Sequence, residues 1–193
     1  MTEADPLAVA LEVGSALDAL AVPWHLGGSL ASSIHGFARA TLDADIVADL
    51  RSGHGSALVA RLGERYYADG TAIEDAIARR ASFNLIHLES MFKVDVFVPG
   101  KSPFERESFA RSREEPLGTP PTRVRVATPE DTVLHKLAWY EKGGRVSDRQ
   151  WGDVVGVLRV QGTRLDVEHL RRWATELNLV ELLDRALHAA SAG

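Results

Sequence analysis

The 193-residue chain contains no cysteine. Disulfide bonds and thiolate metal sites are therefore excluded, which is compatible with a reducing cytosol. The chain also lacks any apolar stretch near the ~20 residues that cross a bilayer. Its first twenty residues, "MTEADPLAVALEVGSALDAL", start acidic and then follow helical periodicity, unlike the basic start of a signal peptide. We therefore expect a cytoplasmic protein with no membrane partner.

The chain has fewer basic than acidic residues, with 22 Lys and Arg against 27 Asp and Glu and a formal net charge of -5. This balance argues against broad nonspecific binding to nucleic acid, although a local basic patch is compatible with contact at a nucleic-acid end. The seven histidines show no His-x-x-x-His or other metal-ligand spacing, so zinc chemistry is not supported. The remaining composition, 45% hydrophobic and 25% charged, is typical of a globular protein.

Hydrophobic periodicity predicts mixed strands and helices in the first two thirds of the chain. The predicted helices are one in the first twenty residues, 29–36 with Ser29 as its cap, 55–65, 71–80 and 104–111. The predicted strands are 24–28, which enters a turn at its glycines, 41–50, 82–90, 92–98 and 122–127, with 82–90 and 92–98 paired as a hairpin. Residues 99–121, rich in Pro, Gly, Arg and Glu, are expected to cross the surface around the short helix.

The last third is predicted to be helical throughout. "TPEDTVLHKLAWYEKGG" carries a Thr128 cap, Pro129 at the first helical position and Gly143 as a stop. Three further helices are predicted near 147–160, 166–177 and 179–190. The sequence thus predicts a mixed α/β (α+β) fold, a small mixed sheet flanked by helices with a helical C-terminal portion, divided into domains 1–127 and 128–193.

The segment "TLDADIVADL" alternates apolar and acidic residues with the period of a strand. Asp43 and Asp45 share one face, roughly 6 to 7 Å apart at their Cα atoms. If the strand 92–98 lies beside this one, Asp95 joins them. Carboxylates so close raise one another's pKa unless a cation neutralises them, and hard oxygen ligands of this kind suit Mg²⁺. The alternative is a solvated sheet face, which shows the same alternation.

A glycine pair precedes this acidic strand. Gly27 and Gly28, followed by a helix near Ser29, supply a tight turn and backbone N–H groups that can hold a phosphate at a helix N-terminus. A plain turn is the alternative for Gly-Gly-Ser alone. A phosphate cradle followed after thirteen residues by Asp-x-Asp supplies both halves of a metal–nucleotide site.

These motifs resemble the nucleotidyltransferase superfamily related to DNA polymerase β. The resemblance lies in "LGGS" at 26–29, "DAD" at 43–45 and "VDV" at 94–96. More narrowly, "GGSLASSIHGFARATLDADI", "ATPEDTVLHKLAWYEKG" and "SDRQWGDVV" look like the small bacterial AbiEii-type nucleotidyltransferase-like proteins, over roughly residues 20–160. The resemblance implies a nucleotidyltransferase-type fold whose helical portion closes over the nucleotide.

The resemblance also implies a chemistry. Asp43 and Asp45 would bind two Mg²⁺ ions, and Asp95 would bind one of them and help deprotonate the acceptor hydroxyl. A nucleoside monophosphate would move from a nucleoside triphosphate to that hydroxyl, releasing pyrophosphate. For AbiEii-like proteins the acceptor would be an RNA 3′ end such as that of tRNA, or a partner protein, in a toxin–antitoxin setting. An antibiotic or other small molecule, or a catalytically inactive nucleotide- or partner-binding protein, is the alternative.

Further residues are candidates for contacts with the nucleotide. Ser29 and the backbone of Gly27 and Gly28 would hold the outer phosphates. Arg39 either neutralises a phosphate or pairs with Asp43 as a structural contact. Lys136 is a candidate triphosphate contact, against the alternative of a surface lysine.

One acid of "SDRQWGDVV" is also expected to face the site. In similar proteins an aspartate from this segment does so. Here either Asp148 or Asp153 fits that position, and Asp148 or Ser147 is alternatively a simple helix cap.

Overall fold

The computed structural model describes residues 5–41 and 43–192, and the chain packs as two units. The first unit runs up to Gly27 and then from Thr41 to Val126, whereas the second combines residues 28–40 with residues 127 onward. Leu42, which falls within the predicted acidic strand, lies outside the described residues, as do the first four residues. Each unit has its own core and is described separately.

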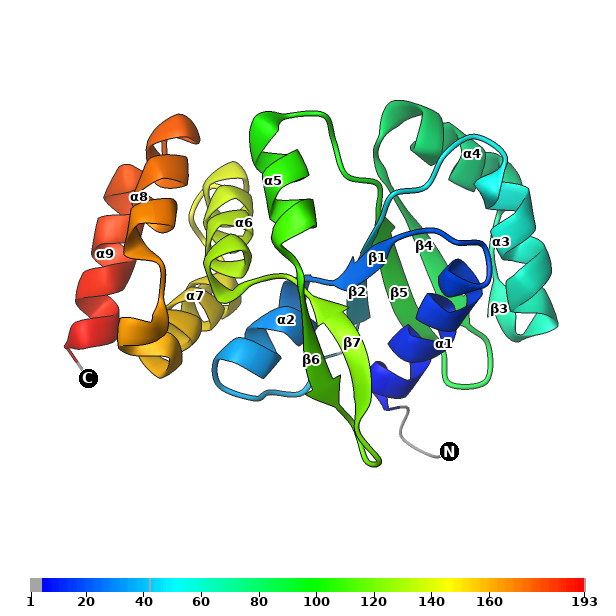
Figure 1. Cartoon of the computed structure of the whole chain (residues 1–193), viewed down its shortest axis with the longest axis horizontal. Coiled ribbons are helices and arrows are strands. Elements are labelled where there is room, and N and C mark those ends of the chain that lie inside the picture. The colour runs from blue at the N-terminus through cyan, green and yellow to red at the C-terminus, as the bar shows by residue number, and fades with distance from the viewer. Residues whose placement is uncertain (1–4, 42, 193) are drawn as a thin grey trace. The chain divides into compact units, whose positions relative to one another are not determined.

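Within the described residues, the first unit is built on a seven-stranded mixed sheet (Figure 1). The strands are β1 (Trp24–Leu26), β2 (Asp43–Ala48), β3 (Tyr66–Tyr67), β4 (Ser82–His87), β5 (Phe92–Phe97), β6 (Arg113–Leu117) and β7 (Thr122–Val126). Their order is β3-β4-β5-β2-β1-β7-β6. The pairs β2–β5 and β1–β7 are parallel and the others antiparallel.

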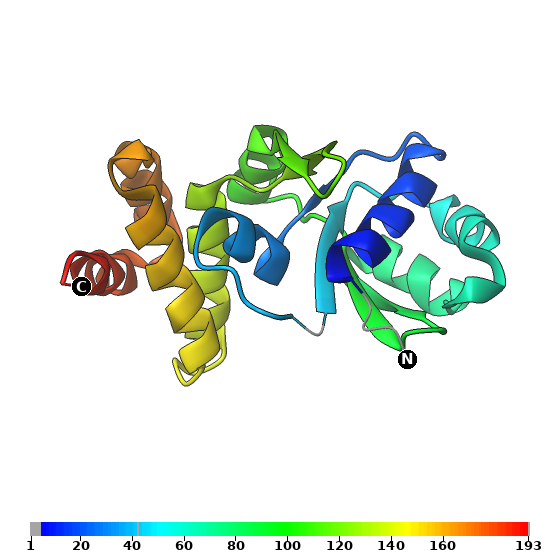
Figure 2. The same ribbon diagram turned by 90° about the horizontal axis from the view of Figure 1, so that it is seen from below.

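Period-2 alternation explains how the central strands bury one face. Ala44, Ile46 and Ala48 of β2 and Val94 and Val96 of β5 are fully buried, whereas the residues between them are only partly covered. The helix α1 (Pro6–Asp18) packs against both strands (Figure 2). Fully burying one such aliphatic side chain contributes about 1.5–3 kcal/mol, so this contact anchors the position of β2 and β5.

The remaining helices of the first unit are α3 (His54–Leu62), α4 (Gly70–Arg79) and α5 (Pro103–Arg111), with a 3₁₀ turn at Gly63–Arg65. Side-chain caps mark the starts of α4 and α5. The Asp69 side chain accepts from the N–H groups of Thr71 and Ala72 at the start of α4. At the start of α5, Ser102 and Glu105 form a capping box.

The second unit is helical, and in Figure 2 its helices from α6 to α9 lie together in yellow to red. Its helices are α2 (Gly28–His35), α6 (Pro129–Lys142), α7 (Asp148–Gln161), α8 (Val167–Glu176) and α9 (Val180–Ser191), with a 3₁₀ turn at Gly162–Arg164. The helix α2 packs against α6 and α7 although more than ninety residues of chain separate it from them. A Cβ at Gly36 would lie 2.9 Å from the backbone nitrogen of Val157, so glycine permits this close approach.

A buried polar network joins α6 to α8. Thr128 caps α6 and donates its hydroxyl to Asp131 Oδ2 at 2.6 Å. Asp131 Oδ1 lies 2.8 Å from Nε2 of His169, and both side chains are buried. The network satisfies polar groups that burial would otherwise leave unpaired.

The mixed α/β fold with a helical C-terminal portion is confirmed. The 82–90 and 92–98 hairpin, the Thr128 cap and the three C-terminal helices are also present. Two strands were not predicted, β3 and β6, and β6 falls inside the segment expected to be a surface crossing. The prediction of Ser29 as a helix cap is wrong, because α2 begins one residue earlier and includes Ser29.

Among the described residues, no helix combines the length and the apolar character that membrane spanning requires.

Candidate functional site

The partly covered face of β2 and β5 carries three acids and one lysine. In the parallel pairing, Asp45 lies opposite Asp95, and Asp43 lies opposite Lys93. All four occupy the strand positions that alternate with buried apolar residues, so their side chains share one face of the sheet. The structure therefore confirms that the strand carrying Asp95 neighbours the strand with the aspartate pair. We call these four residues the acidic face.

Polar contacts engage Lys93, Asp95 and Asp43 of the acidic face. The Lys93 Nζ lies 2.7 Å from Asp95 Oδ2, and the lysine side chain is 42% exposed against 15% for the aspartate. Thr41 donates its hydroxyl to the backbone carbonyl of Asp43 at 2.9 Å and to its Oδ1 at 3.1 Å. The hydrogen bond from Lys93 to Asp95, together with the negative charges of Asp95, Asp43 and Asp45, raises the pKa of Lys93 against the opposing effect of desolvation. The lysine therefore acts as a counter-cation for the three acids.

The acidic face fits a divalent cation in its chemistry and its register. It offers three carboxylates from two adjacent strands, the hard oxygen donors that Mg²⁺ prefers. Within residues 5–41 and 43–192, however, no three His, Cys, Asp or Glu side chains stand ready as a group that could hold a metal ion. The orientations agree with this, since Asp95 faces Lys93 and Asp43 faces Thr41. The donors are present, and side chains must turn before they surround an ion.

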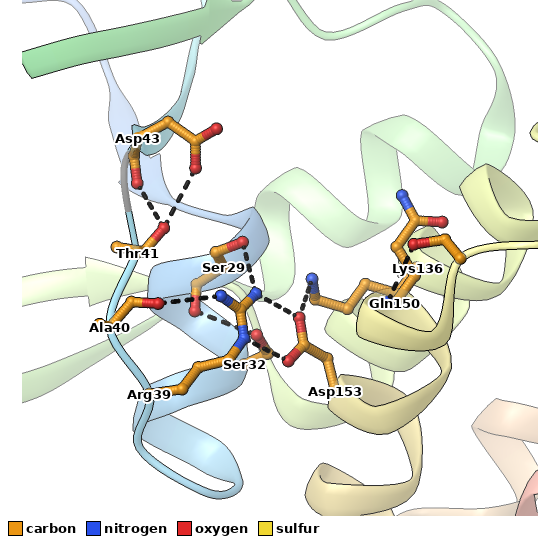
Figure 3. Close-up of polar contacts among 10 residues, drawn as sticks. Ser29, Ser32, Arg39, Ala40, Thr41, Asp43, Lys136, Gln150 and Asp153 are labelled. Atoms are coloured by element: carbon orange, nitrogen blue, oxygen red, sulfur yellow. Dashed lines mark hydrogen bonds and ion pairs between the residues drawn. The ribbon is translucent and has the colours of Figure 1, made fainter.

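The second unit contains a cationic cluster, which we define as Ser29, Arg39, Lys136 and Asp153. The Arg39 guanidinium donates two hydrogen bonds of 2.7 Å to the two carboxylate oxygens of Asp153. The Lys136 Nζ donates to Asp153 Oδ2 at 2.8 Å, and Arg39 also donates to the Ser29 hydroxyl at 3.0 Å. Figure 3 shows the two cationic side chains pointing at the carboxylate from opposite sides. The loop after α2, through Arg39, and the helix α6, through Lys136, thus meet at the carboxylate that α7 carries.

The charge of this cluster is unbalanced in favour of cations. Burial of Asp153 would raise the pKa of its carboxyl, but the hydrogen bonds and charges of Arg39 and Lys136 outweigh burial and lower the pKa. The aspartate is therefore ionised at neutral pH and offsets one of the two positive charges. One net positive charge remains, with Arg39 24% exposed, so the cluster suits an anionic group such as a phosphate.

The glycine pair lies where the chain passes from one unit to the other. The Gly27 N–H donates to the Asp45 carbonyl at 2.9 Å and so continues the sheet beside β2. Gly28 begins α2 with a φ of 47°, a left-handed conformation that glycine adopts without strain. The Gly27 amide is thus engaged in the sheet, whereas Gly28 and Ser29 form the first turn of a helix.

The structure shows which acid of the 147–155 segment contacts Arg39 and Lys136, and it adds residues that sequence reasoning missed. The alternative that placed Arg39 against Asp43 is corrected, because its guanidinium pairs with Asp153. Asp153 joins Arg39 and Lys136, whereas Asp148 is exposed in the first turn of α7, which Ser147 caps. Lys93 was not predicted as a site residue, although its position two residues before Asp95 on a strand already implied a shared face. No sequence signal pointed to Thr41.

Comparison with known proteins gives structural matches only. No protein-family model matches the chain, and a search of curated proteins also finds no match. The solution structure of the antibiotic-resistance factor ANT(2'')-Ia is similar at a TM-score of 0.55 and 16% identity, over 94% of this chain and 96% of that one. The crystal structure of ANT(2'')-Ia in complex with adenylyl-2''-tobramycin gives a TM-score of 0.56 at 13% identity, over 89% and 95%.

A nucleotidyltransferase-like protein is also similar. It is an antigenic protein from Paracoccidioides brasiliensis, with a TM-score of 0.50 and 14% identity over 97% of this chain and 94% of that one. At these identities the likeness shows a shared fold. The chain therefore has a nucleotidyltransferase-type fold with a helical C-terminal part.

Proposed function

We propose that this protein is a Mg²⁺-dependent nucleotidyltransferase that transfers a nucleoside monophosphate from a nucleoside triphosphate to a hydroxyl group. The observation that carries the proposal is the parallel pairing of β2 and β5, with Asp43, Asp45 and Asp95 on one face. This three-acid pattern on a fold shared with nucleotidyltransferases supports catalysis more directly than the fold does alone.

The acidic face would hold the metal and receive the proton. Asp43, Asp45 and Asp95 are the residues that would bind two Mg²⁺ ions, and bound ions supply Lewis-acid polarisation of the phosphate. Asp95 would take up the proton of the acceptor hydroxyl. The acceptor oxygen then bonds to the α-phosphorus while the bond from that phosphorus to pyrophosphate breaks. The proton leaves to solvent afterwards.

The cationic cluster would bind the outer phosphates. Arg39 presents a planar fork that matches phosphate oxygens, and Lys136 adds a point charge. Asp153 would act as a positioning residue, because it holds both cations through hydrogen bonds of 2.7–2.8 Å. Ser29 and the backbone at Gly28 would add neutral donors.

Two acceptor classes follow from different arguments. The resemblance to AbiEii-like proteins favours an RNA end, such as that of tRNA, or a partner protein in a bacterial toxin–antitoxin setting within the cytoplasm. The match to ANT(2'')-Ia in complex with adenylyl-2''-tobramycin, over 89% of this chain and 95% of that one, favours a small antibiotic molecule such as tobramycin. We therefore retain small-molecule adenylyl transfer as a second candidate function.

Nucleotide-dependent stabilisation tests the shared part of both candidates. Mg²⁺ and each nucleoside triphosphate are titrated against thermal stability in wild type, Asp45→Asn and the control Asp75→Asn, which alters an exposed aspartate on α4. A ligand at 100 times its dissociation constant stabilises a fold by about 2.7 kcal/mol. We expect a Mg²⁺-dependent shift in wild type and Asp75→Asn, and its loss in Asp45→Asn.

Transfer itself is then measured with the nucleotide that gives the shift. The nucleotide, labelled at the α-phosphate, is incubated with tRNA, cell protein and aminoglycosides, and pyrophosphate is assayed in parallel. Label on one acceptor class together with pyrophosphate release identifies the reaction. Binding without label or pyrophosphate would support a catalytically inactive nucleotide-binding protein instead.

A further inference from the structure

We propose that Lys93 is a built-in counter-cation of the acidic face that a divalent metal ion must displace from Asp95. This inference rests on the proposed function, because it concerns the same carboxylates. It assigns a role to a residue for which the transfer reaction itself has no use.

The position of Lys93 in the sheet is the first argument. It stands two residues before Asp95 on β5 and opposite Asp43 on β2, while Asp45 stands opposite Asp95. The four side chains therefore occupy the corners of a two-by-two block on one face of a parallel strand pair. An ammonium at one corner lies within reach of an acid along its own strand and of an acid across the pair.

The contact it makes is the second argument. Its Nζ lies 2.7 Å from Asp95 Oδ2, the distance of a charge-assisted hydrogen bond. Asp95 is thereby turned toward the lysine, which agrees with the absence, in the described part of the chain, of a carboxylate group ready to hold an ion. A metal that takes Asp95 as a ligand needs the same oxygen atoms, so the two cations compete.

The exposure of the side chains makes the exchange feasible. Lys93 is 42% exposed, so its ammonium can swing into water on its flexible stem when Asp95 changes partner. The lysine would thus offset the repulsion among the three acids before the metal arrives. Its presence would lower the apparent metal affinity, because metal binding must first break the Lys93–Asp95 ion pair.

Metal affinity without nucleotide tests this competition. Mn²⁺ is titrated against wild type, Lys93→Gln and Lys93→Arg, with free Mn²⁺ followed by electron paramagnetic resonance. Lys101→Gln is the matched control, since it removes the same charge from an exposed site in the same unit. We expect Lys93→Gln to bind Mn²⁺ about fivefold more tightly, the scale of a partly exposed ion pair. The Mn²⁺ affinity of Lys93→Arg, which keeps the positive charge, and of Lys101→Gln, which leaves the ion pair intact, should stay within about twofold of wild type.

A second measurement uses the unaltered protein and so does not depend on a variant folding. Lysine labelling by an amine-reactive reagent, followed residue by residue with mass spectrometry, should speed up at Lys93 when Mg²⁺ is added. The labelling of Lys101 should not change. Both the variants and the labelling thus report on the metal alone, without turnover.

Each outcome separates this inference from the proposed function. If wild type binds Mn²⁺ but Lys93→Gln binds it equally or more weakly, and Mg²⁺ leaves Lys93 labelling unchanged, Lys93 is not a competitor and only this inference falls. If wild type and Lys93→Gln both fail to bind Mn²⁺, both this inference and the metal part of the proposed function are wrong. Binding by Lys93→Gln alone would support the competition in its strongest form.

Discussion

Replacing Asp153 with asparagine leaves Arg39 and Lys136 without their shared anion. The aspartate side chain is 7% exposed and Lys136 10%, so water can replace the lost carboxylate only in part. Removing one partner of a buried ion pair costs about 3–5 kcal/mol, because the other charge stays buried without compensation. Arg39 is 24% exposed and recovers some hydration. We therefore expect Asp153→Asn to destabilise the second unit by about 3 kcal/mol.

Urea unfolding measures this loss. Three of the four tryptophans, Trp139, Trp151 and Trp173, belong to the second unit, so tryptophan fluorescence mainly reports its unfolding. With a slope of about 2 kcal/mol per molar urea, the midpoint should fall by about 1.5 M. Asp148→Asn is the matched control on the same helix and should cost less than about 1 kcal/mol, since that residue is exposed.

The pH dependence of stability tests whether the loss in Asp153→Asn comes from the ionised carboxylate. The folded protein lowers the pKa of Asp153, so its ion pairs contribute stability above the unfolded-state pKa of about 3.9. That contribution is lost as the pH falls through the lower folded-state pKa. The difference between wild type and Asp153→Asn should therefore be constant from pH 7 to 5 and shrink only below about pH 4. A loss under about 1 kcal/mol at pH 7 would refute the reasoning, because such a value is typical of a solvent-exposed pair.

Three further substitutions test the packing of the second unit by urea unfolding. Asp131→Asn should lower the free energy of unfolding by about 2 kcal/mol, because one amide cannot satisfy both partners of the buried carboxylate, of which His169 is one. A loss below about 0.5 kcal/mol, the size of an ordinary surface substitution, would contradict this expectation. Gly36→Ala should lower the free energy of unfolding by about 1–3 kcal/mol, because the new Cβ would clash with the backbone of Val157. An unchanged urea midpoint would mean that α2 and α7 can move apart without loss of stability. Gly28→Ala should lower the free energy of unfolding by about 1–2 kcal/mol, because alanine is strained at the left-handed φ of this position. A variant more stable than wild type would show that the backbone there shifts to a negative φ.

The sequence predicted most helices and strands because their signals are local. Alternating burial along 43–48 and 92–97 follows directly from the alternation of apolar and polar residues. The capped start of the 129–142 helix follows from Thr128 and Pro129. The strand β6 escaped prediction because Pro116 and its charges are typical of a loop, and pairing with β7 overrides that local preference.

The candidate site was predictable in its residue types but not in its contacts. The motif spacing indicated Asp43, Asp45 and Asp95, and the resemblance indicated Lys136, yet neither specified a partner for any of them. The choice between Asp148 and Asp153 depends on which turn of α7 faces α2 and α6, and helical periodicity alone does not define the neighbouring helix. Whether the site residues act in catalysis stays a prediction.

The sequence by itself determined the period of each element, the acids on one strand face and the absence of cysteine chemistry, because these depend on the chain within a few residues. Only the tertiary structure decided that β5 lies parallel to β2 with Asp45 opposite Asp95, and that Lys93 takes Asp95 as its partner. It also decided that Arg39 reaches Asp153, which lies 114 residues further along the chain, and shares it with Lys136. Such pairings depend on strand order and helix packing, which follow from the burial of the whole chain rather than from any local pattern.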